Sequence, residues 1–185
     1  MNYLIIGNSA AGISGVEAIR SIDIKSKITV VSEEDYPVYS RCLLSYFLAG
    51  DRKEESLVYR GGDFYRAFTV DAMIGDRCEK ILPEEKTAKT RGGKSVKFDR
   101  LLIASGAIPV FPDIKGMDKK GIFGLRTIAD AKEIMRALPG ANKIAILGGG
   151  LIGLKAAYGL SKHGKAISVI VKSGQLLSQS LDRRA

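Results

Sequence analysis

The sequence predicts an α/β fold that contains two β-α-β units, the first of which carries an added antiparallel β segment. Two observations support this prediction. Short apolar runs end in glycine-rich turns and lead into helical patterns, and this arrangement occurs twice, about 140 residues apart. A third observation is a run of β-type segments in the middle of the chain. The 185 residues are enough for one domain or two small ones.

The first predicted unit begins with a buried strand over residues 3–6, which ends at Gly7. Residues 10–20 carry apolar side chains at every third position, a pattern typical of a helix that packs on a sheet. Residues 28–31 form a second buried strand. The helix between the two strands has the crossover length that a parallel pair requires.

The central part of the chain is predicted to be mostly β-structure. Short helices are expected within residues 42–49 and 53–68 before it begins. A longer helix is expected from Ile128 to Leu138, ended by Pro139 and Gly140. The expected strands cover residues 69–74, 77–82, 87–90, 95–98 and 100–104, with a hairpin turn over 91–93.

The second unit repeats the first. A strand over residues 144–147 runs into the turn Gly148–Gly153, and residues 166–171 form the second strand. This turn is a complete G-x-G-x-x-G sequence, whereas the first copy, Gly7–Gly12, has Ser9 at the middle position. One such motif is a weak signal, but two copies, each inside a β-α-β unit, are a strong one.

Each position of this motif has a physical reason. The first glycine permits the tight turn, the small middle residue lets the backbone approach a pyrophosphate, and the third glycine lets the helix lie close to the strands. The helix amino terminus offers free N–H groups to the phosphates. The sequence therefore predicts two Rossmann-like dinucleotide-binding units. Two tight turns in a domain that binds no nucleotide are a less favoured interpretation.

An acidic residue is expected after the second strand, where it would accept hydrogen bonds from the ribose hydroxyls. The first unit has Glu33 there, with Glu34 beside it, but the second has Lys172. Lysine has no acceptor, so it cannot bind ribose in that way. Either Lys172 pairs with a 2′-phosphate or it is simply solvated, and the sequence leaves both alternatives open.

These motifs, together with Tyr39–Ser45, Leu101–Pro109 and Leu125–Thr127, resemble the pyridine nucleotide–disulfide oxidoreductases. Within that family the sequence is similar to NADH oxidases, rubredoxin and ferredoxin reductases, and the amino-terminal region of nitrite reductase large subunits. The triplet Ala104-Ser105-Gly106 resembles the family's Ala-Thr-Gly signature, with serine in place of threonine.

The resemblance implies a FAD-dependent NAD(P)H oxidoreductase in which hydride passes from nicotinamide to flavin and then to an unknown acceptor. FAD would bind to a domain over residues 1–112, and NAD or NADP to one over 113–185. The implied FAD contacts are Gly7, Ser9, Ala10, Ala11, Gly12, Glu33, Arg41, Cys78, Ala104, Ser105 and Gly106. The implied nicotinamide nucleotide contacts are Gly148, Gly150, Leu151, Ile152, Gly153 and Lys172.

Cys42 has two interpretations. Some members of the family carry a redox cysteine at this place, where a helix amino terminus and Arg41 would stabilise a catalytic thiolate. The flanking residues Arg41 and Leu43 differ from that pattern, however, and favour a packed cysteine at a helix start.

The family resemblance also implies that the chain is incomplete, because members are longer and return to the flavin domain after the nucleotide domain. We therefore expect an amino-terminal fragment or a short natural product. Its partners would be nucleotides, an electron-acceptor protein or the missing carboxyl-terminal half, and we expect an oligomer. The alternative is a non-catalytic dinucleotide-binding module, or a subunit that another chain completes.

The amino-acid composition indicates which classes of ligand and partner to expect. Lys and Arg number 29 against 20 Asp and Glu, a net charge of +9 that favours anionic ligands. The basic residues are scattered and no nucleic-acid motif accompanies them, so no nucleic acid partner is expected. No window holds the ~18 apolar residues of a membrane span, and no metal site is expected. Two cysteines suggest a reducing, cytoplasmic compartment.

Overall fold

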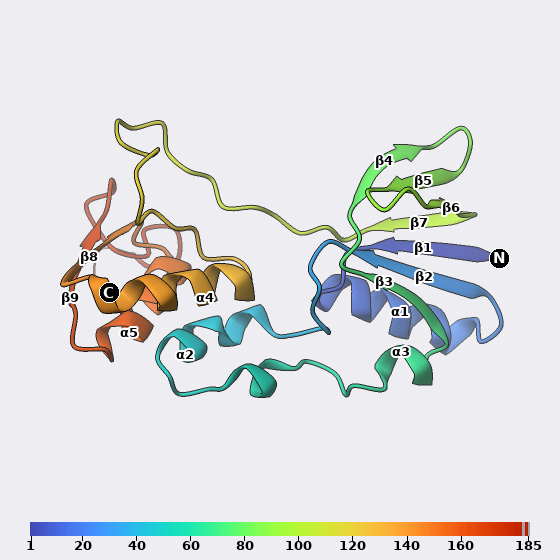
Figure 1. Cartoon of the computed structure of the whole chain (residues 1–185), viewed down its shortest axis with the longest axis horizontal. Coiled ribbons are helices and arrows are strands. Elements are labelled where there is room, and N and C mark those ends of the chain that lie inside the picture. Colours follow the sequence, from blue (N-terminus) through green and yellow to red (C-terminus); the bar gives the residue numbers. More distant parts are fainter. Residues whose placement is uncertain (183, 185) are drawn as a thin grey trace. The chain divides into compact units, whose positions relative to one another are not determined.

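The computed structural model describes residues 1–182 and 184 and contains two compact units (Figure 1). The first unit consists of Met1–Ser40 and Val58–Ala107. The second consists of Arg41–Leu57 and the chain from Ile108 onward. The polypeptide therefore enters each unit twice.

A four-stranded parallel sheet forms the centre of the first unit. Its strands are β1 (Asn2–Ile6), β2 (Lys27–Ser32), β3 (Val70–Ile74) and β7 (Arg100–Ile103), in the order β3-β2-β1-β7. Helix α1 (Ala10–Ile22) lies across one face of this sheet (Figure 1). Fully buried side chains of both layers form the core there, among them Ile5, Ile13, Val16, Ile28 and Val30.

The predicted antiparallel segment is present on the same unit. Strands β4 (Cys78–Leu82), β5 (Thr87–Thr90) and β6 (Ser95–Lys97) form a three-stranded antiparallel sheet. Ala88 of β5 and Phe98, which directly follows β6, are buried and pack against Leu4 and Val31 of the parallel sheet. A short helix, α3 (Phe64–Ala67), precedes β3, which extends the parallel sheet.

The second unit contains the repeat. Strands β8 (Lys143–Leu147) and β9 (Ala166–Ile170) pair in parallel, and α5 (Leu151–Ser161) connects them. Helix α4 (Ile128–Ala137) precedes them and begins with a capping box of Thr127 and Asp130. It ends in a 3₁₀ turn, Leu138–Gly140. The sequence predicts this ending from Pro139 and Gly140.

Residues 41–57 complete the second unit. They form a 3₁₀ turn (Arg41–Leu43), helix α2 (Leu44–Leu48) and a second 3₁₀ turn (Glu54–Leu57). Helix α2 contacts α4 and α5, and a Cβ on Gly159 of α5 would lie 2.6 Å from the Ser45 carbonyl oxygen. The predicted domain limits, 1–112 and 113–185, remain a prediction.

The two β-α-β units share one local geometry. The Gly7 N–H donates to the Val31 carbonyl at 2.8 Å, and the Gly148 N–H donates to the Ile170 carbonyl at 2.9 Å. Both glycines have positive φ, +120° and +112°, which side chains strongly disfavour. A Cβ on Gly12 or Gly153 would overlap the carbonyl oxygen of the first glycine of its own turn. The roles predicted for the first and third glycines are therefore those that the structure shows.

We expect Gly12→Ala to destabilise the first unit by about 1–3 kcal/mol, because the added methyl forces α1 away from β1. Urea unfolding measures this change. Gly62→Ala is the matched control, since a Cβ there meets nothing within 4 Å in the same unit. Equal stability of the two variants would contradict the glycine–carbonyl contact.

Candidate functional site

The first candidate site lies at the carboxyl ends of the parallel strands. Strands β2 and β3 lie on one side of β1, and β7 lies on the other. The chain therefore adds strands in one direction from β1 and later in the opposite direction, which makes the edge beside β1 a topological switch point. Open α/β sheets bind ligands at such a switch point. The Gly7 turn lies there against Ala104, whose N–H donates to the Ile6 carbonyl at 2.7 Å. The structure thus brings two predicted cofactor-binding stretches, 7–12 and 104–106, together.

The amino terminus of α1 faces this switch point with its donors free. Ser9 is the N-cap residue in extended conformation, and its side chain makes no capping hydrogen bond. The first helical hydrogen bond runs from the Ile13 N–H to the Ser9 carbonyl. The N–H groups of Ala10, Ala11 and Gly12 therefore have no helical partner, which is the arrangement that binds phosphate.

A pair of tyrosines that the sequence does not single out holds this turn in place. The Tyr65 hydroxyl donates to Asn8 Oδ1 at 2.6 Å, and Asn8 Nδ2 donates to the Tyr36 carbonyl at 3.2 Å. Burial raises the pKa of the Tyr65 hydroxyl, which keeps it protonated and able to donate. The turn is therefore fixed by the protein before a ligand arrives.

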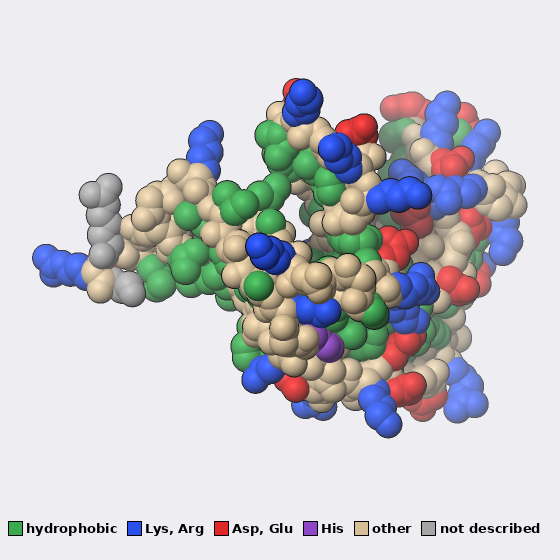
Figure 2. All heavy atoms as spheres, turned by 60° about the vertical axis from the view of Figure 1, so that its left-hand side comes forward, with side chains coloured by type: hydrophobic (Ala, Val, Ile, Leu, Met, Phe, Trp, Pro, Cys, Tyr) green, Lys and Arg blue, Asp and Glu red, His purple; other side chains and the backbone are tan. Residues whose placement is uncertain are grey.

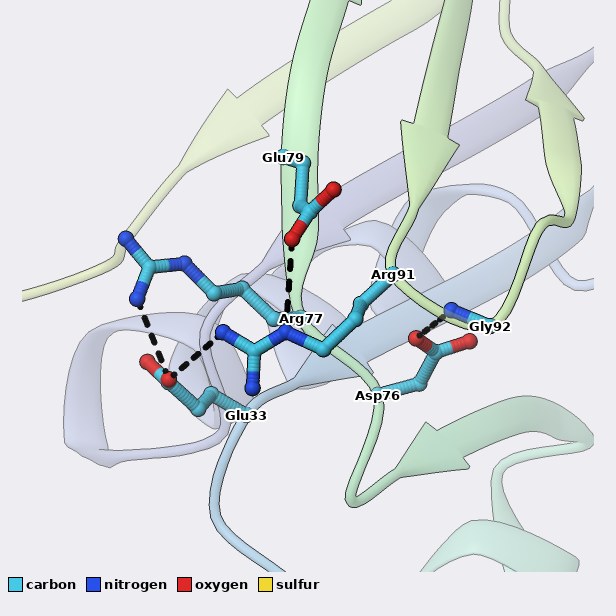
Figure 3. Close-up of polar contacts among 6 residues, drawn as sticks. All are labelled: Glu33, Asp76, Arg77, Glu79, Arg91 and Gly92. Atoms are coloured by element: carbon cyan, nitrogen blue, oxygen red, sulfur yellow. Dashed lines mark hydrogen bonds and ion pairs between the residues drawn. The ribbon is translucent and has the colours of Figure 1, made fainter.

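Glu33 follows β2, and two arginines contact its carboxylate (Figure 3). Arg77 Nη1 lies 3.2 Å and Arg91 Nη2 3.5 Å from the same oxygen, Oε1. Glu33 Oε2 accepts no hydrogen bond from the described residues, so one oxygen remains available for a ribose hydroxyl. Arg91 Nε also lies 3.3 Å from Glu79 Oε1, which ties the end of β5 to β4. Neither arginine is predicted from the sequence as part of the site.

Two further residues, Asp76 and Cys78, flank Arg77 in the sequence. Asp76 accepts a hydrogen bond from the Gly92 N–H at 3.0 Å, which holds the pKa of Asp76 below its ordinary value (Figure 3). Cys78 is the first residue of β4 and directly follows Arg77. Burial raises the pKa of the Cys78 thiol, so it stays protonated at neutral pH. The predicted contacts Glu33 and Cys78 thus lie on neighbouring segments.

The second candidate site is the Gly148–Gly153 turn. Gly150 is the N-cap residue of α5, with φ −79° and ψ 176°, which any residue can adopt. A Cβ at Gly150 would meet nothing within 4 Å, so the contacts within the chain do not require glycine there. The side chains of Leu151 and Ile152, which follow, are 63% and 61% exposed. The open surface at Gly150 fits the close approach of a pyrophosphate.

The segment after β9 borders this turn on its other side. The Leu177 N–H donates to the Gly149 carbonyl at 2.8 Å, and a Cβ on Gly149 would overlap Val171. Lys172 lies in this segment, is exposed, and has no hydrogen-bond or ion-pair partner among the described residues. The structure thus places Lys172 just beyond the end of β9, on a segment that is hydrogen-bonded to the glycine turn.

The whole chain, residues 1–185, matches the family described as pyridine nucleotide-disulphide oxidoreductase. The chain belongs to this family. The predicted family and the predicted α/β fold are therefore confirmed.

Relatives of known activity match nearly the whole chain. It is 33% identical to "Nitrite reductase [NAD(P)H]" of Bacillus subtilis, over 98% of the chain and 23% of that protein. It is 33% identical to "NADH-dependent phenylglyoxylate dehydrogenase subunit epsilon" of Aromatoleum evansii, over 99% of the chain and 44% of that protein. The chain thus spans less than half of the length of these relatives.

A solved structure is similar to this chain over nearly all of its length. The NAD-dependent persulfide reductase from A. fulgidus superimposes with a TM-score of 0.92 at 31% identity. The match covers 99% of this chain and 36% of that one.

Arg41 and Cys42 belong to the second unit. Both lie in the 3₁₀ turn before α2, in the second unit, whereas Gly7–Gly12 and Glu33 lie in the first. Arg41 Nη1 donates to the Arg126 carbonyl at 2.9 Å, and Cys42 is exposed. Their roles toward FAD and in redox chemistry remain predictions. Among residues 1–182 and 184, no group of His, Cys, Asp and Glu is arranged to hold a metal ion.

Gly150→Ala and Gly153→Ala should affect different properties, nucleotide affinity in the first case and stability in the second. We expect Gly150→Ala to change stability by less than about 1 kcal/mol, because its Cβ meets no protein atom. It should lower nucleotide affinity about tenfold, because the methyl occupies the path of the pyrophosphate. Gly153→Ala should destabilise the unit instead. Urea unfolding, with ADP titration followed at the Leu151 and Ile152 amide signals, measures both effects. Full nucleotide affinity in Gly150→Ala would contradict the site.

Glu33→Gln should weaken ADP binding to the first unit about tenfold or more, because the ribose hydroxyls lose a charged acceptor. Glu79→Gln is the matched control: it also pairs with Arg91 and is similarly exposed, but lies within β4. Both exposed pairs should contribute less than about 1 kcal/mol to stability. ADP titration followed at the Ala10 and Ala11 amide signals separates the variants. Equal affinities would show that Glu33 only anchors the arginines.

Proposed function

We propose that the chain is a FAD-dependent NAD(P)H oxidoreductase or the amino-terminal part of one. In this proposal hydride passes from nicotinamide to flavin and then to an electron acceptor. One observation carries it: two turns of the same geometry in one chain, each at a helix amino terminus whose first N–H groups have no helical partner. Membership of the pyridine nucleotide-disulphide oxidoreductase family supports the same chemistry.

The first unit is proposed to hold FAD. The N–H groups of Ala10, Ala11 and Gly12 would bind the pyrophosphate, and Glu33 Oε2 would accept from the ribose. The Ala104–Gly106 turn would border the flavin, because it lies against Gly7 at the switch point. FAD would supply the electron-accepting ring, while the residues of the chain bind, orient and shield it.

The second unit is proposed to hold the nicotinamide nucleotide. The Leu151 and Ile152 N–H groups would bind its pyrophosphate, and Gly150 would give it access to the backbone. We propose residues 1–112 as the FAD-binding domain and residues 113–185 as the domain for NAD or NADP. The names of the relatives, which specify NADH, NAD(P)H or NAD, support a nicotinamide nucleotide as the electron donor.

Exposed apolar residues support the proposal that the chain works with a partner. Strand β7 lies at the edge of its sheet, and Ile103 on it is 61% exposed. In the second unit Leu147 and Ile170, at the ends of the two paired strands, are 53% and 54% exposed. Unpaired edges and apolar side chains of this kind invite another chain. They also favour the second candidate function, a dinucleotide-binding module that a second polypeptide completes.

Charge and helix length bear on the remaining partners. On the face drawn in Figure 2, Lys and Arg side chains stand among Asp and Glu side chains without forming one basic stripe. This supports small anionic ligands over nucleic acid. No helix among the described residues is long and apolar enough to cross a membrane. Two free cysteines support a reducing compartment, and we propose the cytoplasm.

Flavin binding and reduction test the proposed function. We expect the chain to bind added FAD, to lose it to excess ADP, and to retain less than one FAD per chain after gel filtration. Under anaerobic conditions NAD(P)H should bleach bound FAD faster than free FAD. Absorbance spectroscopy and light scattering on one preparation measure these properties, and the sample should be oligomeric or partner-bound.

A Cys42→Ser variant, measured in the same way, tests whether Cys42 takes part in electron transfer. Cys42→Ser should leave bleaching unchanged if Cys42 is a packed helix-start residue, and should abolish later electron transfer if it is the redox group. Failure to bind either FAD or ADP would overturn the proposed function. A monodisperse monomer with one tightly held FAD and steady NAD(P)H turnover would overturn the need for a partner.

A further inference from the structure

The two nucleotide turns differ most at the residue that follows the second strand of each unit. We infer that the second unit binds NADPH in preference to NADH, with Lys172 as the residue that contacts the 2′-phosphate. This inference rests on the proposed function, which places a nicotinamide nucleotide on that unit. Three observations support it. Lys172 occupies the position that Glu33 occupies in the first unit, its side chain is exposed without a partner among the described residues, and the β-α-β segment around it is rich in lysine.

The hydrogen-bond register makes Lys172 equivalent to Glu33. In the first unit the N–H of the first glycine donates to the Val31 carbonyl, and Glu33 lies two residues further on. In the second unit the corresponding acceptor is the Ile170 carbonyl, and Lys172 lies two residues further on. The strands pair in the same register, Ile6 with Val31 and Leu147 with Ile170. Glu33 and Lys172 can therefore be compared directly, as the residues at the same position of the two β-α-β units.

The two side chains also differ in their surroundings. The Glu33 carboxylate is paired with Arg77 and Arg91 through one oxygen. Lys172 is exposed and has no hydrogen-bond or ion-pair partner within residues 1–182 and 184. Its backbone is nonetheless held near the glycine turn, because Leu177 donates to the Gly149 carbonyl. An unpaired ammonium group thus stands at the place where the first unit offers a carboxylate.

The charge of the whole β-α-β unit points the same way. Residues 143–181 contain five lysines and no Asp or Glu, whereas residues 2–34 contain four acidic and three basic residues. A ribose hydroxyl needs an acceptor, which lysine cannot provide. A 2′-phosphate carries about two negative charges and accepts a charge-assisted hydrogen bond from an ammonium group. The second unit is therefore suited to the phosphorylated ribose.

The expected preference is about ten- to a hundredfold in affinity, as for one charge-assisted contact. It is measured on the full chain by titrating NADP⁺ and NAD⁺, which differ only in the 2′-phosphate, and following the Leu151 and Ile152 amide signals. These amides report the second unit, and those of Ala10 and Ala11 report the first. The preference should shrink as salt is raised, because the contact is exposed.

Substitutions assign the preference to Lys172. Lys172→Glu should remove or reverse it, and Lys172→Gln, which changes charge by less, should reduce it. Lys143→Glu is the matched control: the same charge change at the amino end of β8, roughly 16 Å along the strand from the turn and beyond the Debye length. The control should keep the wild-type ratio.

The outcomes separate this inference from the proposed function. Equal affinities for the two nucleotides, or tighter binding of NAD⁺, would overturn the NADPH preference while leaving the second nucleotide site intact. A wild-type ratio in both Lys172 variants would overturn the role of Lys172. If neither nucleotide perturbs Leu151 and Ile152, the proposed second nucleotide site is wrong, and the inference falls with it.

Discussion

The nucleotide turns depend on one close approach, that of the third glycine of each motif to the carbonyl oxygen of the first. Gly12 lies against Gly7, and Gly153 against Gly148, with no room for a Cβ in either pair. This contact brings the helix amino terminus directly beyond the end of the first strand. The free N–H groups of that terminus then lie near the end of the second strand, which is followed by Glu33 in one unit and by Lys172 in the other. We propose that the backbone forms a phosphate site in each unit, and that Glu33 and Lys172 determine which ribose the site accepts.

The charged side chains around Glu33 in the first unit differ from those around Lys172 in the second. Around Glu33, four charged side chains from three segments form an exposed network, in which each pair contributes little stability. The network fixes the carboxylate more than it strengthens the fold. Around Lys172 no such network exists among the described residues, and the β-α-β segment 143–181 contains five lysines and no Asp or Glu. The same backbone therefore presents an oriented acceptor in one unit and an unpaired donor in the other.

Local patterns in the sequence predict the parts of the fold that depend on local chemistry. The glycine spacing predicts both turns, the apolar periodicity predicts α1, and Pro139 with Gly140 predicts where α4 ends. Contacts between distant residues are not predictable in this way. Arg77 meets Glu33 across 44 residues, and Tyr65 meets Asn8 across 57, because sheet topology brings them together. The packing of residues 41–57 on α5 depends on the missing side chain of Gly159, which no local pattern reveals.

The central claim is that one chain carries two separate phosphate cradles. The number of ADP molecules bound per chain tests this most directly. Equilibrium dialysis of the 185-residue protein at saturating ADP should give two per chain, because the first N–H groups of the helix after each turn have no helical partner. A stoichiometry of one or zero would contradict the account.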